Sequence, residues 1–269
     1  LENFPEYMQF LNGRENINSL SELRDSNNYT ILALDCASKD RIWPKDIFDR
    51  AERIVNIDHH SDNTKFGNIN VVNSFVSSTA ELLYNLFKVN KSKLNLEICE
   101  NIYSGILFDT GGFRYQNTNY ETLIISSELL QKGVNASKIG EFVFNIWSES
   151  GFRALKTALK NLEYFGAGKI LFSFISYKEI VEEDLKSEDF EGIVDILRSN
   201  RNARIIILLR EIEKNVFKGS LRSKGEISIN QVARKFNGGG HPHAAGFEIK
   251  YDNVNAIKDK LIKELLQLI

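Results

Sequence analysis

The stretch that decides the fold is Ile54-Val55-Asn56-Ile57-Asp58-His59-His60, an apolar run that ends in one carboxylate and two imidazoles. The apolar part predicts a β-strand over 53–57. Because open α/β folds bind ligands at the carboxyl ends of their strands, this ending predicts a functional site at that edge of a sheet. The chain has four histidines, and the other two, His241 and His243, lie in the stretch Gly238-Gly239-Gly240-His241-Pro242-His243. Their confinement to two polar motifs favours a site built from two distant segments over scattered surface histidines.

The composition of the chain limits the classes of protein to which it can belong. The chain has 269 residues, 42% hydrophobic and 26% charged, which is typical of a soluble globular protein with one large or two modest domains. A net charge of −2 excludes a global basic field, so a polyanionic substrate is expected to be short or held by a local basic patch. Cys36 and Cys99 are expected to be free buried thiols in a reducing cytosol. We find no signal peptide, spanning apolar run or lipidation motif, which predicts a cytoplasmic protein without a membrane partner.

The first half of the chain has the pattern of a mainly parallel α/β domain. The run over 29–34 is apolar on both faces, which is typical of a parallel strand covered on both sides. Pro44 opens a short helix and the strand over 53–57 follows, so the three elements form a βαβ unit. Asp35 and the Asp-His-His motif are therefore expected to end neighbouring strands. Helices are expected near 77–87, 96–107, 119–132 and 136–147.

Ser77-Ser78-Thr79-Ala80-Glu81, at the start of the first of these helices, has two interpretations. Ser77 or Ser78 can cap the helix, with Glu81 closing a capping box. A serine-rich helix start can also hold an anion. Capping alone explains these residues, and we favour it.

The second half of the chain changes pattern after a predicted linker. We assign residues 1–150 to the first domain, 151–167 to a linker helix and 168–269 to a smaller α/β domain. Apolar residues at helical spacing from Phe152 to Leu162 predict a helix over 151–165, ended by Gly166-Ala167-Gly168. Beyond it the pattern predicts strands at 170–175, 203–209, 215–220 and 246–249, and helices near 177–184, 188–198, 227–236 and from 254 onward.

Two polar clusters suggest chemistry. Asp35, His59 and Asp109 each follow a predicted strand or helix, and carboxylates with imidazole and no thiolate favour Mn²⁺ or Mg²⁺, with Fe²⁺ or Co²⁺ as alternatives. A lone aspartate after a strand is usually a turn or cap residue, but three such segments with a histidine pair favour a metal site. The second cluster comprises Arg222, Ser223, Lys224, Gly238–Gly240 and His241. Such residues can bind an anion, or they can form a solvated charged hairpin.

These motifs together resemble the DHH phosphoesterase family. Leu34-Asp35, Asp58-His59-His60 and the stretch 108–114 are similar to motifs of its first domain. Glu191–Val194, Leu221–Lys224 and the stretch 238–246 are similar to the DHH-associated C-terminal domain. The two-domain size is most similar to the bacterial oligoribonucleases, or nano-RNases, that also dephosphorylate 3′-phosphoadenosine 5′-phosphate (pAp).

The resemblance implies a role for each site residue. Asp35 would bridge two Mn²⁺ ions, with Mg²⁺ or Co²⁺ as alternatives, and His59 and Asp109 would be further ligands. Asp58 would orient the histidine and His60 would contact the scissile phosphate, while Arg114 would neutralise charge. The second domain would grip the phosphate or terminal nucleotide across an interdomain cleft through Arg222, Ser223, Gly239, Gly240 and His241.

Several readings stay open at this point. Short oligonucleotides, dinucleotides and phosphorylated nucleosides are the expected substrates, and a cyclic or linear dinucleotide phosphodiesterase would use the same site. The family's first motif, His-x-x-x-Asp-x-Asp, has no counterpart in this sequence, and the resemblance would place it before residue 1. A nucleotide-binding module without catalysis is therefore the alternative from another class, and a homodimer is also allowed.

Overall fold

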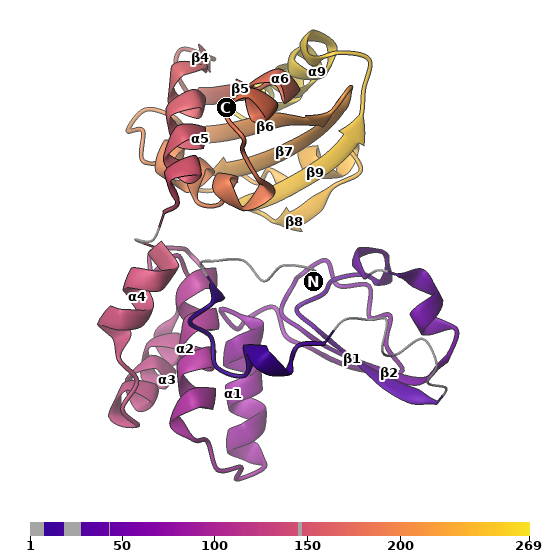
Figure 1. Cartoon of the computed structure of the whole chain (residues 1–269), viewed down its shortest axis with the longest axis vertical. Coiled ribbons are helices and arrows are strands. Elements are labelled where there is room, and N and C mark those ends of the chain that lie inside the picture. The colour runs from indigo at the N-terminus through magenta and orange to yellow at the C-terminus, as the bar shows by residue number, and fades with distance from the viewer. Residues whose placement is uncertain (1–7, 19–27, 43, 145–146) are drawn as a thin grey trace. The chain divides into compact units, whose positions relative to one another are not determined.

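The described residues of this computed structural model are 8–18, 28–42, 44–144 and 147–269, and they divide into two units, 1–146 and 147–269 (Figure 1). The first unit contains the expected parallel sheet, with the strand order β1-β2-β3. Its strands are β1 (Tyr29–Leu34), β2 (Ala51–Asp58) and β3 (Ile69–Val72). The short helix expected after Pro44 is a 3-10 turn, Lys45–Phe48. The strand β3 was not predicted, because its run of four residues is too short to stand out.

One face of β1 differs from the prediction. Leu32 and Leu34 are 56% and 43% exposed, so the expectation of a strand covered on both sides is wrong for this face. Among the described strands, β1 pairs only with β2 and is an edge strand. An apolar run on both faces therefore identified the parallel strand correctly but not its place in the sheet.

Four helices complete the first unit, as expected: α1 (Thr79–Val89), α2 (Leu96–Asp109), α3 (Tyr120–Gln131) and α4 (Ala136–Phe144). Leu82 of α1 packs with Ile57 of β2 and ties this helix to the sheet. The four helices share a separate core that includes Cys99, Ile106 and Leu129. This packing holds the N-terminus of α1 and the C-terminus of α2 near the ends of β1 and β2.

The second unit is a six-stranded mixed sheet with the order β4-β5-β6-β7-β9-β8, in which only β5 and β6 are parallel. Its strands are β4 (Leu162–Phe165), β5 (Ile170–Ile175), β6 (Ile205–Glu213), β7 (Val216–Ser223), β8 (Gly239–His241) and β9 (Ala244–Lys250). The helices α8 (Asn230–Lys235) and α9 (Val254–Leu266) cover one face. The other face carries α5 (Glu149–Lys160), α6 (Tyr177–Glu182), η6 (Ser187–Phe190) and α7 (Ile193–Arg198).

The predicted helix over 151–165 is wrong in its second half. The helix α5 ends at Lys160, and residues 162–165 form β4, which pairs antiparallel with β5. Gly166, Ala167 and Gly168 all have positive φ and form the turn of this hairpin rather than a helix stop. The leucine spacing continues the helical period into β4, so hairpin pairing overrides the local pattern.

Other predictions need smaller changes. The helix expected at 188–198 is divided into η6 and α7 by Gly192, which has φ 78°. The helix expected at 227–236 is shorter, since α8 covers only Asn230–Lys235. Cys36 and Cys99 are free and buried, as expected. Within the described residues, no helix has both the length and the apolar character needed to cross a bilayer.

Candidate functional site

The ends of β1, β2 and α2 bring the three predicted metal ligands together. The Nε2 atom of His59 lies 3.6 Å from Oδ1 of Asp35 and 3.6 Å from Oδ2 of Asp109. One ligand atom from each of the three residues lies within 4.8 Å of the others. His59 is 4% exposed, whereas the side chain of Asp35 is 52% exposed, so the cluster has a buried side and an open side. The predicted convergence of Asp35, His59 and Asp109 therefore exists in the first unit.

Backbone geometry explains why Asp35 reaches His59. Asp35 directly follows β1 and has φ 56°, in the left-handed region that aspartate tolerates better than most residues. Its N–H donates to the carbonyl of Ile57, so the turn stays attached to β2. The side chain accepts a 2.7 Å hydrogen bond from Oγ1 of Thr79, in the first turn of α1. The strained residue is held from two sides, which is common at functional sites.

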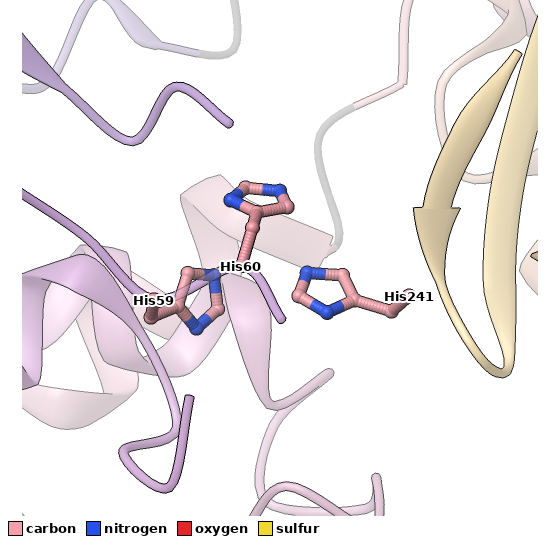
Figure 2. Close-up of side chains that lie close together, drawn as sticks. All are labelled: His59, His60 and His241. Carbon is pink, nitrogen blue, oxygen red and sulfur yellow. The ribbon is translucent and has the colours of Figure 1, made fainter. Parts of the chain in front are cut away.

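His60 and Asp58 form the second part of the cluster. Nδ1 of His60 lies 2.7 Å from Oδ1 of Asp58, and the rings of His59 and His60 pack edge to face with centroids 4.9 Å apart (Figure 2). Oδ2 of Asp58 accepts a 2.6 Å hydrogen bond from Nδ2 of Asn63. Asp58 is fully buried, so these two contacts fix its carboxylate. The residue oriented by Asp58 is His60.

Sequence reasoning missed the residues that support this cluster. Nδ2 of Asn63 also lies 2.8 Å from Oδ1 of Asn56 and 3.1 Å from the carbonyl of Cys36, which joins β2 to the turn after β1. The capping prediction is confirmed for Ser78, whose side chain accepts the N–H of Glu81. The predicted capping box is not formed with Ser78, because the Glu81 carboxylate accepts hydrogen bonds from the N–H and hydroxyl of Ser77. The contact of Thr79 with Asp35 was not foreseen. The only sequence signal for these roles is the nearness of polar residues to the two motifs.

Burial and charge shift the protonation of the cluster. Burial, and then the charge of Asp35, raise the pKa of Asp109 to about 7. Burial and the positive charge of His60 lower the pKa of His59. Burial also acts to lower the pKa of His60, but its hydrogen bond with Asp58 and the charge of that carboxylate outweigh burial and raise it. Two carboxylates this close to one imidazole repel each other, and a cation between them would relieve that repulsion.

Arg114 lies in the loop that follows α2. Its Nε donates to the carbonyl of Gly111 at 2.5 Å, and its guanidinium carbon lies 5.5 Å from the centroid of the Phe144 ring. The side chain thus packs along its own loop and against α4. Its predicted contact with substrate charge stays a prediction.

In the second unit, Arg222 is paired with an acid that sequence reasoning did not assign to it. Its Nε and Nη2 lie 3.1 Å and 3.4 Å from the two carboxylate oxygens of Asp195. Asp195 belongs to α7, which packs on β6 and β7 and covers this part of the sheet. The ion pair holds the guanidinium in a fixed place on β7, where it remains 25% exposed.

Ser223 and His243 support the loop around this arginine. Ser223 is fully buried, and its hydroxyl lies 2.5 Å from the carbonyl of Ile227 and 3.1 Å from Nδ1 of His243. Its N–H also donates to the carbonyl of His243. Ser223 therefore stabilises the connection from β7 toward α8. Its predicted contact with substrate stays a prediction.

The glycine motif forms the β8–β9 hairpin. Gly239, Gly240 and His241 pair with residues of β9 at the edge of the six-stranded sheet. Gly240 has φ 131°, and a Cβ there would lie 2.6 Å from the carbonyl oxygen of Ala244. A Cβ at Gly238 would lie 2.1 Å from the carbonyl oxygen of Gly246. The glycines therefore let two backbones approach closely, and His241 is presented at the edge.

Comparison with known proteins identifies counterparts for both halves of the chain. The model of the DHH family, N-terminal domain, matches residues 3–106, and the model of the DHHA1 domain matches residues 167–267. A bifunctional oligoribonuclease and PAP phosphatase NrnA from Thermus thermophilus is 32% identical over 248 residues, which cover 91% of this chain and 72% of the relative. The protein of the same name from Bacillus subtilis is 29% identical over 281 residues, covering 98% of this chain and 87% of the relative.

A solved structure has the same fold. The crystal structure of an exopolyphosphatase-related protein from Bacteroides fragilis matches with a TM-score of 0.86 and 30% identity. The match covers 99% of this chain and 82% of that one. The α/β fold is therefore shared with a known structure along nearly the whole chain.

Proposed function

The chain belongs to the DHH family and carries a DHHA1 domain, and from this premise we propose a metal-dependent phosphoesterase that hydrolyses short oligonucleotides and pAp. The observation that carries the proposal is the convergence of Asp35, His59 and Asp109, with Nε2 of His59 3.6 Å from an oxygen of each carboxylate. The two NrnA relatives support the substrates, because their names give oligoribonuclease and PAP phosphatase activities.

The residues of the cluster fit a divalent cation. Two carboxylates and one imidazole offer ligand atoms within 4.8 Å of one another. Oxygen and nitrogen donors without a thiolate suit Mn²⁺ or Mg²⁺, and we propose Mn²⁺. When bound, such an ion supplies positive charge that polarises the phosphate and stabilises the charge that develops on it.

The protein's own side chains bind and orient the substrate. His60, whose ring Asp58 holds through Nδ1, contacts the scissile phosphate in this proposal, and Arg114 balances charge beside it. Arg222 and the β8–β9 hairpin with His241 hold a part of the substrate that does not react. The free cysteines Cys36 and Cys99 support a cytoplasmic location, where thiols stay reduced.

The test is hydrolysis by the purified chain with Mn²⁺, using pApA, pAp and cyclic di-AMP, with products separated by chromatography. We expect pApA to give AMP and pAp to give AMP and phosphate, with both reactions lost on chelation. Preferred cleavage of cyclic di-AMP would instead support a cyclic dinucleotide phosphodiesterase. Metal-independent nucleotide binding without hydrolysis of any substrate would refute the proposed enzyme and favour a binding module.

A further inference from the structure

The segment 76–79, which leads into α1, contacts two of the three proposed metal ligands directly. Oγ1 of Thr79 donates to Oδ1 of Asp35 at 2.7 Å. The side chain of His59 makes a hydrogen bond with the backbone of Val76. The four residues of this segment are buried, so its position is set by the fold around it.

The same segment reaches the third proposed ligand through one asparagine. Nδ2 of Asn117 donates to the carbonyl of Ser77 at 2.8 Å and to the carbonyl of Asp109 at 3.0 Å. One side-chain amide thus joins the start of α1 to the end of α2. The position of the segment 76–79 is therefore linked to the positions of all three residues proposed to hold the metal.

Glu81 holds the segment from inside the first unit. Its side chain is fully buried, and Oε2 accepts hydrogen bonds from the N–H of Ser77 at 3.2 Å and from its hydroxyl at 2.5 Å. Oγ1 of Thr122, in the first turn of α3, donates to the same oxygen at 2.8 Å. A single carboxyl oxygen therefore fixes Ser77 between the starts of α1 and α3.

The burial of Glu81 costs stability that the fold does not fully recover. In the part of the chain that the structure describes, its Oε1 has no hydrogen-bond partner, and no basic side chain pairs with the carboxyl group. A buried polar atom without a partner is costly, and an apolar side chain can support packing without that cost. Local features that oppose stability are expected at functional sites, which favours a role for Glu81 in the site.

We propose that Glu81 is a positioning residue of the metal site: by fixing the segment 76–79, it holds Asp35, His59 and Asp109 at the spacing that a divalent cation needs. The inference rests on the proposed function and deepens it, because it names the residue on which the geometry of the ligands depends. Residues that hold metal ligands in place contribute about 10- to 100-fold to metal affinity or activity.

The test measures Mn²⁺ affinity by calorimetry in wild-type protein, Glu81→Ala and Glu81→Gln. Glu81→Ala should bind Mn²⁺ at least about 10-fold more weakly, because Ser77 loses both of its bonds to the carboxyl oxygen. Glu81→Gln should retain most of the affinity. Its amide oxygen can accept the three bonds of Oε2, and its amide nitrogen takes the place of Oε1, which has no partner to lose among the described residues.

Glu128→Ala is the matched control. Glu128 lies in α3 and accepts hydrogen bonds from the hydroxyl of Tyr84 and from Nζ of Lys88, both in α1. It therefore joins the same two helices as Glu81, but it contacts neither the segment 76–79 nor a proposed ligand. Its replacement should lower the melting temperature and leave the Mn²⁺ affinity of the folded protein unchanged.

Three results decide the inference when wild-type protein binds Mn²⁺. If Glu81→Ala melts at a lower temperature but binds Mn²⁺ as wild type does, Glu81 supports only the fold and the inference is overturned. Equal weakening in Glu81→Ala and Glu81→Gln would assign the effect to charge and would overturn positioning by hydrogen bonds. If Glu81→Ala does not fold, Asn117→Ala removes the link to Asp109 while Glu81 stays in place. An affinity about 10-fold weaker in this variant would support the inference, and an unchanged affinity would overturn it.

A wild-type protein that binds no Mn²⁺ would refute the proposed function, and crystal structures then test the positioning role alone. Functional groups must be held within about 0.5 Å of their working geometry. A larger shift of the Asp35 or Asp109 carboxylate in Glu81→Ala, absent from Glu128→Ala, would support the role of Glu81. Unshifted carboxylates would overturn it.

Discussion

Replacement of Asp189 tests how the second unit is held together. Its Oδ1 accepts hydrogen bonds from the hydroxyls of Ser148 and Ser150 at 2.7 and 2.6 Å, and its Oδ2 accepts the N–H of Lys186 at 2.7 Å. The residue is 5% exposed, so its carboxylate joins the start of α5 to the turn η6 from inside the fold.

Asp189→Ala should lower the free energy of unfolding by about 3–4 kcal/mol at pH 7. Each hydrogen bond to a charged acceptor contributes about 1.5–3 kcal/mol, but bonds that share one carboxylate do not add fully. Glu188→Ala is the matched control, because Glu188 is exposed in the same turn, and its loss should cost less than about 0.5 kcal/mol.

The effect should depend on pH in a defined direction. Burial acts to raise the pKa of Asp189, but the hydrogen bonds from Ser150, Lys186 and Ser148 outweigh it and lower the pKa below its ordinary value. A carboxyl group whose pKa is lowered by folding contributes its full stabilisation at pH values above its pKa in the unfolded chain, about 3.9 for aspartate. This stabilisation is lost as the pH falls through the pKa of the group in the folded protein. The difference between wild type and Asp189→Ala should therefore shrink between pH 5 and pH 3.

Tryptophan fluorescence gives a local assay. The ring of Trp147 lies against Gly192, since a Cβ on that glycine would be 3.1 Å from Cζ2 of the tryptophan. The ring also packs on the core cluster that contains Phe190, the neighbour of Asp189. Urea unfolding of Trp43→Phe protein, which retains Trp147 as the single tryptophan of the sequence, measures the second unit at each pH. A cost below about 0.5 kcal/mol at pH 7, or a cost that stays constant down to pH 3, would refute the reasoning.

Three further predictions follow from the sites. Asp109→Ala should weaken Mn²⁺ binding at least about 10-fold in calorimetry and remove most hydrolysis, and unchanged metal affinity would exclude Asp109 as a ligand. Arg222→Ala should raise KM for dinucleotides about 10- to 100-fold with much less change in kcat, and Arg222→Lys should rescue only partly; a fall in kcat alone would instead place Arg222 at the scissile phosphate. Gly238→Ala should lower the melting temperature, because the new Cβ would lie 2.1 Å from the carbonyl oxygen of Gly246. Gly140→Ala should leave the melting temperature unchanged, because no atom lies within 4 Å of its new Cβ.

The sequence predicts those strands and helices that can be recognised from their own residues, without knowledge of the elements they pack against. The strand β1 has the predicted bounds, Tyr29–Leu34, because an apolar run bounded by polar residues needs no partner to be recognised. The strand β4 was missed because Leu162 continues the leucine spacing of α5, and only pairing with β5 makes residues 162–165 a strand. Pairing of this kind is not visible in the local pattern.

The same division applies to the candidate site. Asp35, His59 and Asp109 were predicted to converge because each ends an element of one parallel domain, and the structure brings them together. Asn63 and Thr79, which hold Asp58 and Asp35, were not predicted, since asparagine and threonine occur in any loop or helix start. Their roles depend on distances that only the folded chain defines.

The close approach of backbones in the β8–β9 hairpin has a consequence for inheritance. A Cβ at residue 238 or 240 would collide with a carbonyl oxygen, so a descendant chain that keeps this hairpin keeps both glycines whether or not it still binds a nucleotide. In a library selected only for folding, positions 238 and 240 would accept almost no replacement, while position 241 would accept many. In the proposed function His241 holds substrate, so selection for that activity would make position 241 equally strict. Gly238 and Gly240 thus mark descent and folding, and His241 would distinguish chains that keep the proposed activity from chains that have lost it.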